Sequence, residues 1–502
     1  MTDRVRYDAS WVDVDPYPQL VDGKELRSGP FHDVIDPSTG QAVAQWAEAT
    51  PDEVDAALAA ARRSYDGGEW SRAPLARRAE VLEAAAVAIR SHGERLVTLE
   101  SLDTGKSVSG ARHFDLYEAS AAFSYAAGIC RDLHGDVRPT SYPPELFPSG
   151  GPEIITLRMR EPAGVVVELL PWNAPLMTGS QRVAAGLAAG CSFVVKPAEE
   201  AVISTINLAR LLEEVGLPRG VLNVVLGPGE TVGEQLVADR RVDLVSLTGS
   251  VATGQRVMAL AARNLTPVHL ELGGKAPVIV FADADLDQAV RWATMAAFVN
   301  NGQVCVSGSR LLAERPVYDA VVEGVAAATH GLPMGDALDP GTFLGPLVTQ
   351  DHADRVRGFL DRAIAGGNAR VVGSPPAPPA HPKTFVAPTV LRDVQPGAEI
   401  EQEEVFGPVL AALPFDTEEQ ALAIANDTRF GLNATVFTRD IERTFRAFAG
   451  LHFGEVNVNC HFTPDMNGAK GEPRKMSGLS AADVEAYTVR KAMNLQVRRA
   501  PG

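Results

Sequence analysis

The sequence predicts an α/β protein built around a doubly wound parallel sheet, and two observations support this prediction. Short runs rich in β-branched residues alternate with segments of helical spacing from Gly164 onward, and the alternation continues as far as GEVNVNC at Gly454. Strands that alternate with helices of this length form βαβ units and parallel sheets. Because 502 residues are too many for one ordinary core, two or three packed domains are expected.

The expected elements of the first half follow in a regular order. Residues from Thr50 to His113 are expected to be helical, because Ala, Leu and Val recur at three- and four-residue spacing. The segment from Arg138 to Pro152 is rich in Pro, Ser and Gly and is expected to be a loop or linker. Four strands are then expected, GVVVELL from Gly164, CSFVVKP from Cys191, GVLNVVLG from Gly220 and VDLVSLTG from Val242, with helices at TINLARLLEEVG and TVGEQLVADR.

The second half repeats this order and therefore predicts a second α/β domain. VHLELGG and APVIVF are expected strands, and DLDQAVRWATMAAFVNN is an expected helix. The segment SPPAPPAHP, from Ser374, contains too much proline for either element and is expected to be a surface loop.

Composition and charge exclude several classes of protein. The formal net charge is −17, and a protein that binds nucleic acid through phosphates needs a basic face, so nucleic acid is not an expected partner. No run approaches the roughly 20 apolar residues of a membrane span, and the segment from Met1 to Trp11 has no apolar signal core. A cytoplasmic protein without membrane contact is expected.

The four cysteines, Cys130, Cys191, Cys305 and Cys460, lie far apart and include no CxxC pair. This spacing predicts neither a disulfide framework nor a zinc site, and no metal ion is expected.

Glycines after two expected strands favour a dinucleotide site. GPGETVG contains Gly229 and Gly233, and LTGSVATG contains Gly249 and Ser250. Glycine at a strand-to-helix turn lets backbone N–H groups approach a pyrophosphate at the helix N-terminus. The first run is GxGxxxG rather than GxGxxG, so a plain turn is an equal alternative for it.

Polar residues follow two further strands. KPAEE places Lys196 and Glu199 where they could bind a ribose, although a solvated turn pair is the simpler alternative. PWNAP places Trp172 and Asn173 after the strand from Gly164. An asparagine amide can stabilise an oxyanion, but it can also cap a helix.

A base and a nucleophile complete the set. ELGGK places Glu271 before Gly273 at a strand end, and FVNNGQVC places Cys305 after an expected helix. Nucleophile, base and oxyanion donor would then all come from turns at one end of the sheet.

These motifs resemble those of the aldehyde dehydrogenase superfamily. PWNAP, KPAE, LTGSVATG, ELGGK, NNGQVC and EEVFGPV occur in the family's order and approximate spacing, and the resemblance runs from about Val21 to Val497. It implies a hydrolytic, NAD-dependent enzyme with a Rossmann-type domain, which forms a homodimer or homotetramer and oxidises an aldehyde through a thioester.

The resemblance also implies a role for each motif residue. Cys305 is the expected nucleophile, Glu271 the general base for thioester hydrolysis, and Asn173 with the backbone N–H of Cys305 the oxyanion hole. The expected contacts with NAD come from the following residues: Trp172, Lys196, Glu199, Gly229, Gly233, Gly249, Ser250, Gly273, Glu404 and Phe406.

Three domains are expected from the strand pattern and the resemblance together. Residues 1–137 and 160–270 would form the dinucleotide-binding domain, and residues 271–464 the catalytic domain. The resemblance adds a small bridging or oligomerisation element of residues 138–159 and 485–502.

Two departures from the family pattern concern proton release and the tunnel wall. Arg182 stands nine residues after Asn173, where family members usually have a lysine, and arginine cannot release a proton near neutral pH. The glycine-rich motif near the C-terminus becomes GEPRKMSGLSAAD, within residues 468–483, and keeps only Lys475, Ser477 and Gly478.

Alternatives remain for the product and the substrate. A dehydrogenase that transfers the acyl group to coenzyme A and a catalytically silent relative are the two alternative functions; the presence of Glu271 favours hydrolysis. Small or polar residues at the expected tunnel wall favour a bulky or polar aldehyde, for example an amino-substituted one, over acetaldehyde. The residues concerned are Ala174, Thr178, Gln181 and Val299 at the wall, and His461, Phe462 and Asp465 near its mouth.

Overall fold

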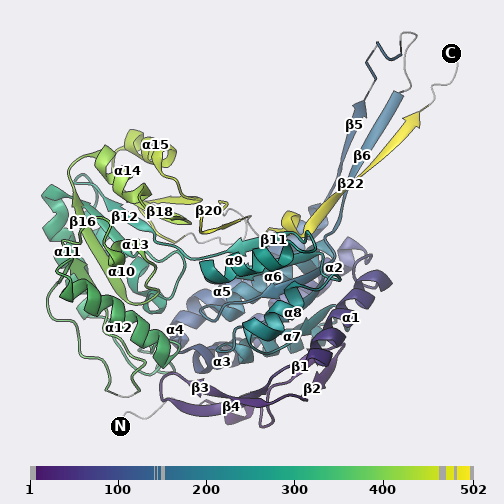
Figure 1. The fold of residues 1–502 in the computed structure, drawn as a ribbon, viewed down its shortest axis with the longest axis horizontal. Coiled ribbons are helices and arrows are strands. Elements are labelled where there is room, and N and C mark those ends of the chain that lie inside the picture. Colours follow the sequence, from purple (N-terminus) through teal and green to yellow (C-terminus); the bar gives the residue numbers. More distant parts are fainter. Residues whose placement is uncertain are drawn as a thin grey trace.

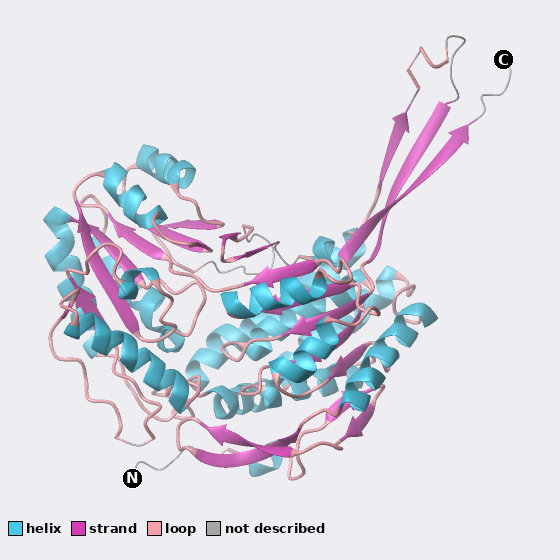
Figure 2. Ribbon diagram, viewed as in Figure 1, coloured by secondary structure: helices cyan, strands magenta, loops and turns pink. Residues whose placement is uncertain are grey.

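The computed structural model describes residues 7–140, 142–143, 145–147, 153–380, 382–462, 471–479 and 483–497. Two α/β halves lie side by side, and a three-stranded sheet projects from one of them (Figure 1). Helices flank the strands of both halves (Figure 2), which confirms the predicted fold class. Among these residues, no helix is both long and apolar enough to cross a membrane.

The first sheet has eight strands, of which the central five are parallel. In spatial order they are β2 (Lys24–Leu26), β1 (Gln19–Val21), β9 (Leu222–Val224), β8 (Ser192–Lys196), β7 (Val165–Leu169), β10 (Leu244–Thr248), β11 (Val268–Glu271) and β21 (Gly478–Leu479). β7, β8 and β9 are buried on both faces, as helices on both sides of a parallel sheet require. Four of these strands lie within the predicted runs between Gly164 and Gly249.

The helices of the first half are α1 (Pro51–Gly67), α2 (Leu75–Ser91), α3 (Gly93–Thr104), α4 (Val108–Gly110), α5 (Tyr117–Asp132), α6 (Pro175–Ala189), α7 (Val202–Glu214), α8 (Glu234–Val237) and α9 (Val251–Ala261), with short turns η1 (Ala9–Trp11), η2 (Ala111–Leu116) and η3 (Gly229–Gly233). α1 begins at Pro51, and its N-cap residue Thr50 forms a capping box with Glu53 in the first turn. The predicted helix TVGEQLVADR is shorter than expected. Residues Gly229–Gly233 form a π-helical turn, in which the N–H of Gly233 donates to the carbonyl of Pro228 at 3.3 Å.

The second sheet has seven strands, six of them parallel: β14 (Arg370–Val371), β15 (Thr389–Arg392), β16 (Val409–Phe415), β13 (Arg310–Glu314), β12 (Pro277–Val280), β18 (Asn433–Phe437) and β19 (Glu455–Val458). Its helices are α10 (Leu286–Phe298), α11 (Arg315–His330), α12 (Gln350–Ala365), α13 (Glu399–Gln402), α14 (Glu418–Asn426) and α15 (Ile441–Gly450), with the turn η4 (Val299–Gly302) after α10. A two-stranded sheet of β17 (Phe430–Gly431) and β20 (Arg474–Lys475) adjoins it, and β3 (Phe31–Asp36) pairs with β4 (Gln41–Ala47) near the N-terminus.

The projecting sheet consists of β5 (Asp136–Thr140), β6 (Glu153–Pro162) and β22 (Thr488–Val497), and the turn η5 (Val484–Tyr487) precedes its last strand. The prediction of a loop from Arg138 was wrong for its first residues, which belong to β5. Pro139 is tolerated there because β5 is an edge strand of this sheet. Described residues between β5 and β6 form no strand, and the domain limits remain a prediction.

Candidate active site

Four sequence motifs meet at the carboxyl edge of the first sheet. PWN follows β7, Lys196 ends β8, Gly249 follows β10, and Glu271 ends β11. These strands are parallel neighbours, so their carboxyl ends share one edge. The sheet therefore brings together side chains that lie as much as 99 residues apart in sequence, from Trp172 to Glu271.

Cys305 lies in an irregular turn between η4 and β13. Asn300, Asn301 and Gly302 all have positive φ, of 49°, 55° and 69°. Asparagine tolerates this left-handed backbone better than other residues with a side chain. Asn301 Nδ2 fixes the turn by donating to the carbonyls of Gly345 and Pro346, at 2.6 and 3.0 Å.

The Asn173 amide contacts the turn that carries the nucleophile. Its Nδ2 donates to the carbonyl of Gln303 at 2.9 Å, two residues before Cys305, and Asn300 Nδ2 donates back to the carbonyl of Asn173 at 3.1 Å. Cys305 is partly exposed. Hydrogen bonds thus connect the predicted oxyanion donor Asn173 with the turn that carries the nucleophile. Asn173 does not cap α6, because the N-cap residue of that helix is Ala174, which makes no side-chain capping bond.

ELGGK joins both halves because glycine permits close contacts. A side chain on Gly274 would lie 2.2 Å from the carbonyl oxygen of Cys305, and one on Gly273 would lie 2.1 Å from Oε2 of Glu404. The N–H of Gly274 also donates to Glu404 Oε1 at 2.8 Å. Burial raises the pKa of Glu404 to about 7. The expected cofactor ligand Glu404 therefore packs directly against the motif that carries the base.

Three rings form a wall beside this point. Trp172 lies edge to face with Phe406, at 5.3 Å between centroids, and with His352, at 5.4 Å. Phe406 has a φ of 56°, and its carbonyl oxygen lies 2.7 Å from Nε2 of His352. Burial lowers the pKa of His352 to about 4, so the ring is neutral and Nε2–H donates.

The expected adenosine end of the cofactor site also comes together. Glu199 Oε1 accepts the N–H of Gly229 at 3.3 Å, which joins the KPAEE turn to the first glycine run. Lys196 is buried and its Nζ donates to the carbonyl of Pro197 at 3.0 Å. Gly233 faces the Lys196 side chain, since a Cβ added at Gly233 would lie 3.7 Å from Lys196 Cδ. After β10, Ser250 caps α9 by accepting the N–H of Thr253.

The base Glu271 is paired with Arg182. Nη2 of Arg182 lies 3.7 Å from Glu271 Oε1. Gly478 is paired in register with Glu271, and the N–H of Leu272 donates to the carbonyl of Ser477 at 2.8 Å. Ser477 and Gly478, which the atypical C-terminal segment retains, therefore position the strand that carries the base.

The other cysteines lack the same setting. All four lie in the described residues and none forms a disulfide. Burial raises the pKa of the Cys130 and Cys460 thiols and that of Cys191 to about 11. Among the described residues, none of these three cysteines forms a hydrogen bond with Asn173 or with the turn that carries Cys305.

Sequence reasoning missed several residues that hold the site. Gln303 receives the Asn173 bond, and its Oε1 accepts the N–H of Val348 at 3.1 Å. His352 had no motif around it that could have indicated its role. His461 was expected near a tunnel mouth but is 1% exposed, and its ring contacts Thr435 Oγ1 and the carbonyl of Val306 at 2.8 Å each.

Among the expected tunnel residues, Ala174, Thr178 and Val299 are buried, and Phe462 packs 6.1 Å from Phe114. Asp465 lies outside the described residues. In the part of the chain that is described, no cluster of His, Cys, Asp and Glu could hold a metal ion.

Comparisons with known proteins agree on one family. The model of the aldehyde dehydrogenase family matches residues 25–497. The chain is 39% identical to a betaine aldehyde dehydrogenase of Cereibacter sphaeroides over 480 residues, which is 94% of this chain and 96% of that one. It is 38% identical to the peroxisomal aminoaldehyde dehydrogenase 1 of Pisum sativum over 432 residues, 85% of this chain and 84% of the relative.

A solved structure extends this likeness to the fold. The betaine aldehyde dehydrogenase of Staphylococcus aureus in complex with NAD⁺ superimposes with a TM-score of 0.91 and 33% identity, covering 100% of this chain and 99% of that chain.

Proposed function

The chain belongs to the aldehyde dehydrogenase family, and on this premise we propose that it oxidises an aldehyde to a carboxylic acid, with NAD as hydride acceptor and Cys305 as nucleophile. The observation that carries the proposal is the bond of 2.9 Å from Asn173 Nδ2 to the carbonyl of Gln303. It holds a neutral donor against the turn that presents the thiol. An amide nitrogen has two hydrogens, so the second can donate to a substrate oxygen.

The residues at the carboxyl edge fit NAD. No described atom lies within 4 Å of the Cβ position of Gly229, so there is space above this glycine, which precedes a helical turn. The Ser250-capped N-terminus of α9 favours a pyrophosphate, and Lys196 with Glu199 would bind the adenosine ribose. Glu404 would bind the other ribose, with Phe406 and Trp172 beside it. NAD supplies one thing to the chemistry, a carbon that accepts hydride.

Attack by sulfur begins the reaction. Cys305 Sγ bonds to the carbonyl carbon as thiolate, because thiolate is a stronger nucleophile at neutral pH than a hydroxyl. Negative charge then develops on the carbonyl oxygen, where Asn173 and the backbone N–H of Cys305 donate hydrogen bonds. Loss of hydride from the tetrahedral thiohemiacetal leaves a thioester on Cys305.

Glu271 completes the cycle by hydrolysis. Its carboxylate removes a proton from water, the hydroxyl adds to the thioester carbon, and the C–S bond breaks to return the thiolate. Arg182 Nη2 lies 3.7 Å from Glu271 Oε1, which places a positive charge beside the carboxylate proposed as the base. A base in this position favours the free acid over transfer to coenzyme A.

The proposed substrate is an aldehyde with an amino or ammonium group. The predicted wall positions are small or polar, and Ala174 and Thr178 lie just after the Asn173 turn. Phe462 and Phe114 form a ring pair next to His461, which bonds the chain directly after Cys305. An aromatic face attracts a cation. Relatives named for aminoaldehydes and betaine aldehyde fit the same chemistry.

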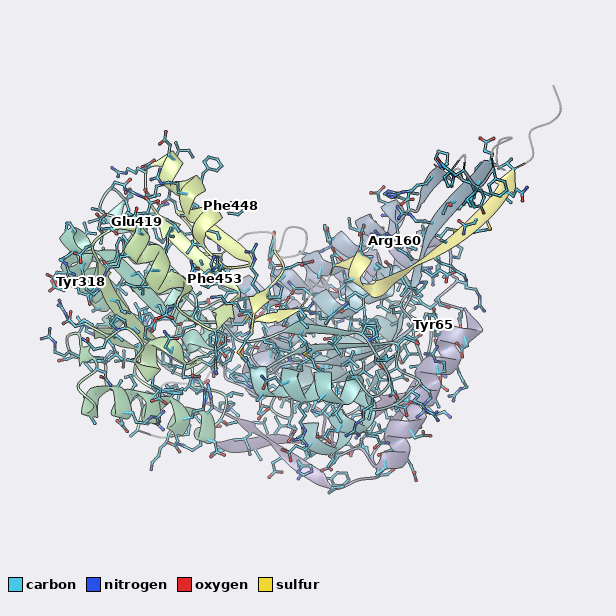
Figure 3. The ribbon with its side chains drawn as sticks, turned by 45° about the horizontal axis from the view of Figure 1, so that its top comes forward. Tyr65, Arg160, Tyr318, Glu419, Phe448 and Phe453 are labelled. Carbon is cyan, nitrogen blue, oxygen red and sulfur yellow. The ribbon has the colours of Figure 1, made fainter. Side chains whose placement is uncertain are left out.

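The proposed assembly is a homodimer or homotetramer. The projecting sheet exposes Val137, Met159 and Met493, and α15 exposes Ile441, Phe445 and Phe448 at helical spacing. Phe448 is labelled in Figure 3 on α15. Groups of exposed apolar side chains favour contact with another protein surface. We propose that this surface belongs to a second copy of the chain. A cytoplasmic location stays a prediction.

A screen of NADH formation tests the proposed activity. It compares acetaldehyde, longer aliphatic aldehydes, benzaldehyde, 3-aminopropionaldehyde and betaine aldehyde, with and without coenzyme A. We expect the highest kcat/KM with an amino- or ammonium-aldehyde and a free acid as product in both conditions. Preference for acetaldehyde would contradict the proposed pocket, an acyl-coenzyme A product would contradict hydrolysis, and no NADH with any aldehyde would indicate a silent relative.

A further inference from the structure

A buried carboxyl lies in the sheet behind Glu271. Glu168 of β7 is register partner of Ser246 of β10, and Ser246 is register partner of His269 of β11. The three side chains share one face of the sheet, and Glu271 lies two residues beyond His269 on that same face. Glu168 is 0% exposed. A carboxyl so deep in a valine-rich parallel sheet is unusual and calls for a partner or a function.

Arg182 connects this carboxyl with the base. It is buried on α6 and lies 3.7 Å from Glu271 Oε1. Burial acts to lower the pKa of Arg182, but the charges of Glu271, Tyr487 and Glu168 outweigh it, and the pKa is raised. Tyr487 of η5 donates its hydroxyl to Glu168 Oε2 at 3.4 Å. The charge of one cation therefore acts on both carboxyls, and this cation keeps its proton at any physiological pH.

The cluster contains several polar atoms that are buried without a hydrogen-bond partner among the described residues. They are Glu168 Oε1, Arg182 Nε, Thr248 Oγ1 and His269 Nδ1. Thr248 is the register partner of Glu271, so these atoms extend from Glu168 toward the base. Buried polar atoms in proteins almost always bind another group or an ordered water. Such a row of donors and acceptors suits water between the two carboxyls.

The pKa of Glu168 lies near neutral pH. Burial raises its pKa to about 7, against the opposing effects of Arg182 and of bonds from Ser246 and Tyr487. Burial and Arg182 lower the pKa of His269 to about 4, so it is neutral. Burial also raises the pKa of Tyr487 and that of Cys191, whose Sγ donates to the Tyr487 carbonyl, so both stay protonated.

We propose, building on the proposed function, that Glu168 receives through water the proton that Glu271 removes from the hydrolytic water. The O–H bond of the attacking water breaks, its proton goes to Glu271 and then to Glu168, and the C–S bond electrons return to Cys305. Arg182 positions both carboxyls as a fixed counter-charge. Once the pair holds one proton, moving it between the carboxyls leaves the net charge of the buried cluster unchanged, which avoids the cost of a second uncompensated charge.

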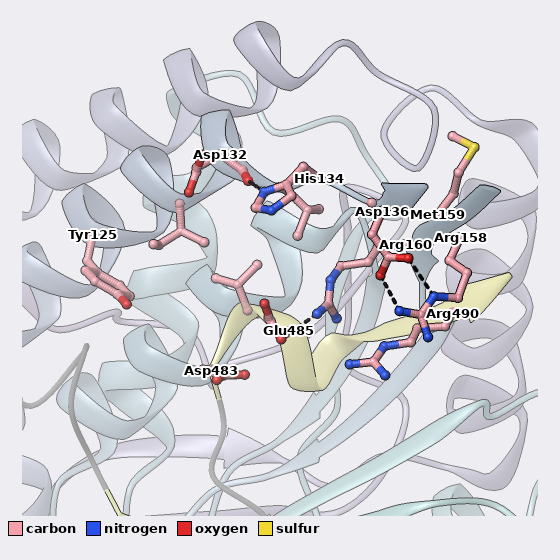
Figure 4. Close-up of a pocket in the computed structure, with 14 residues that line it drawn as sticks. Tyr125, Asp132, His134, Asp136, Arg158, Met159, Arg160, Asp483, Glu485 and Arg490 are labelled. Carbon is pink, nitrogen blue, oxygen red and sulfur yellow. Dashed lines mark hydrogen bonds and ion pairs between the residues drawn. The ribbon is translucent and has the colours of Figure 1, made fainter. Parts of the chain in front are cut away.

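The turn η5 connects the cluster with a surface cavity. Tyr487 ends η5 inside the cluster, while Val484 and Glu485 of the same turn line a cavity of about 280 Å³ at the base of the projecting sheet (Figure 4). The charge of Asp483, which also lines this cavity, partly opposes the lowering of the His269 pKa by burial and Arg182. Proton release from Glu168 to solvent is therefore proposed on this side, away from the aldehyde.

The test separates the first turnover from hydrolysis. Glu168→Gln should leave NAD affinity and the rate of first-turnover NADH formation unchanged, while acid release, followed by rapid quench, slows about tenfold. This is less than the usual 10²–10⁴-fold effect of a group at the reacting atoms. In the wild type, acid release should fall as pH falls through about 7, because Glu168 must be ionised to accept a proton. This dependence should be absent in Glu168→Gln.

Two further variants make the result specific. Tyr487→Phe removes a bond that favours the ionised carboxylate, so the pH dependence should move to higher pH. Ser192→Ala is the control: its buried, unpartnered hydroxyl lies on the opposite face of the same sheet and should change nothing. Equal loss of both rates in Glu168→Gln, or an unchanged pH profile in it and in Tyr487→Phe, would overturn the inference. A wild type that forms no NADH would instead overturn the proposed function.

Discussion

The two halves of the molecule contribute to the site in different ways. The first half places its groups directly after regular strands, as with Lys196 at the end of β8 and Glu271 at the end of β11. The second half places Cys305 and Phe406 in turns whose backbone has positive φ at Asn300 or at Phe406 itself. The first half thus supplies the carboxyl edge of a regular sheet, and the second half supplies two irregular turns that pack against this edge.

The difference shows what each half depends on. A side chain at the end of a parallel strand is placed by the sheet, and the sheet is stabilised by buried valine and leucine over many residues. The Cys305 turn depends on particular bonds from Asn173, from Asn301 to Gly345, and from His461 to Val306. Substitutions at the Cys305 turn of the second half should therefore abolish NADH formation, while substitutions at the strand ends of the first half should reduce its rate by a finite factor.

The largest expected effect is that of Cys305→Ser. A serine hydroxyl is a much weaker nucleophile than a thiolate at neutral pH, so NADH formation should fall below detection while NAD still binds, as followed by the change in protein fluorescence. Cys130→Ser serves as a matched control, because that thiol is buried in the first half and should leave turnover within a few-fold of the wild type. Appreciable activity in Cys305→Ser would show that the second half does not supply the nucleophile.

The next largest effects should distinguish two residues of the first half. Asn173→Ala should slow first-turnover NADH formation by about 10²–10³-fold, the usual loss for one oxyanion donor. Glu271→Gln should leave that first turnover and slow acid release instead, so that a burst of NADH is followed by slow turnover. Stopped-flow absorbance at 340 nm measures both. Equal loss of the burst in the two variants would mean that the division of labour between them is wrong.

The same contrast explains what could be predicted from sequence. The fold class followed from the β-branched runs, because a strand buried on both faces has few other residues to use. Motif order then indicated the residues at the strand ends. The bond from Arg182 to Glu271, the row from Glu168 to His269 and the contact of His461 with Val306 could not be predicted, since each joins segments whose distance is set only by tertiary packing. Pro139 in β5 was misassigned because an edge strand tolerates proline.

The smallest expected effect concerns the choice of cofactor, at the adenosine end of the regular edge. Glu199 accepts the N–H of Gly229, beside Lys196, and would face the 2′-hydroxyl of the ribose. A 2′-phosphate there would meet a carboxylate of like charge, while the nearby lysine offsets part of the repulsion. We therefore expect a higher kcat/KM with NAD than with NADP, and Glu199→Gln should reduce this preference by about tenfold. Glu214→Gln, an exposed acid at the far end of α7, is the control. If the ratio of the two kcat/KM values is the same in the wild type and in Glu199→Gln, the carboxylate does not select the cofactor. The selectivity would then lie in the shape of the turn rather than in its charge.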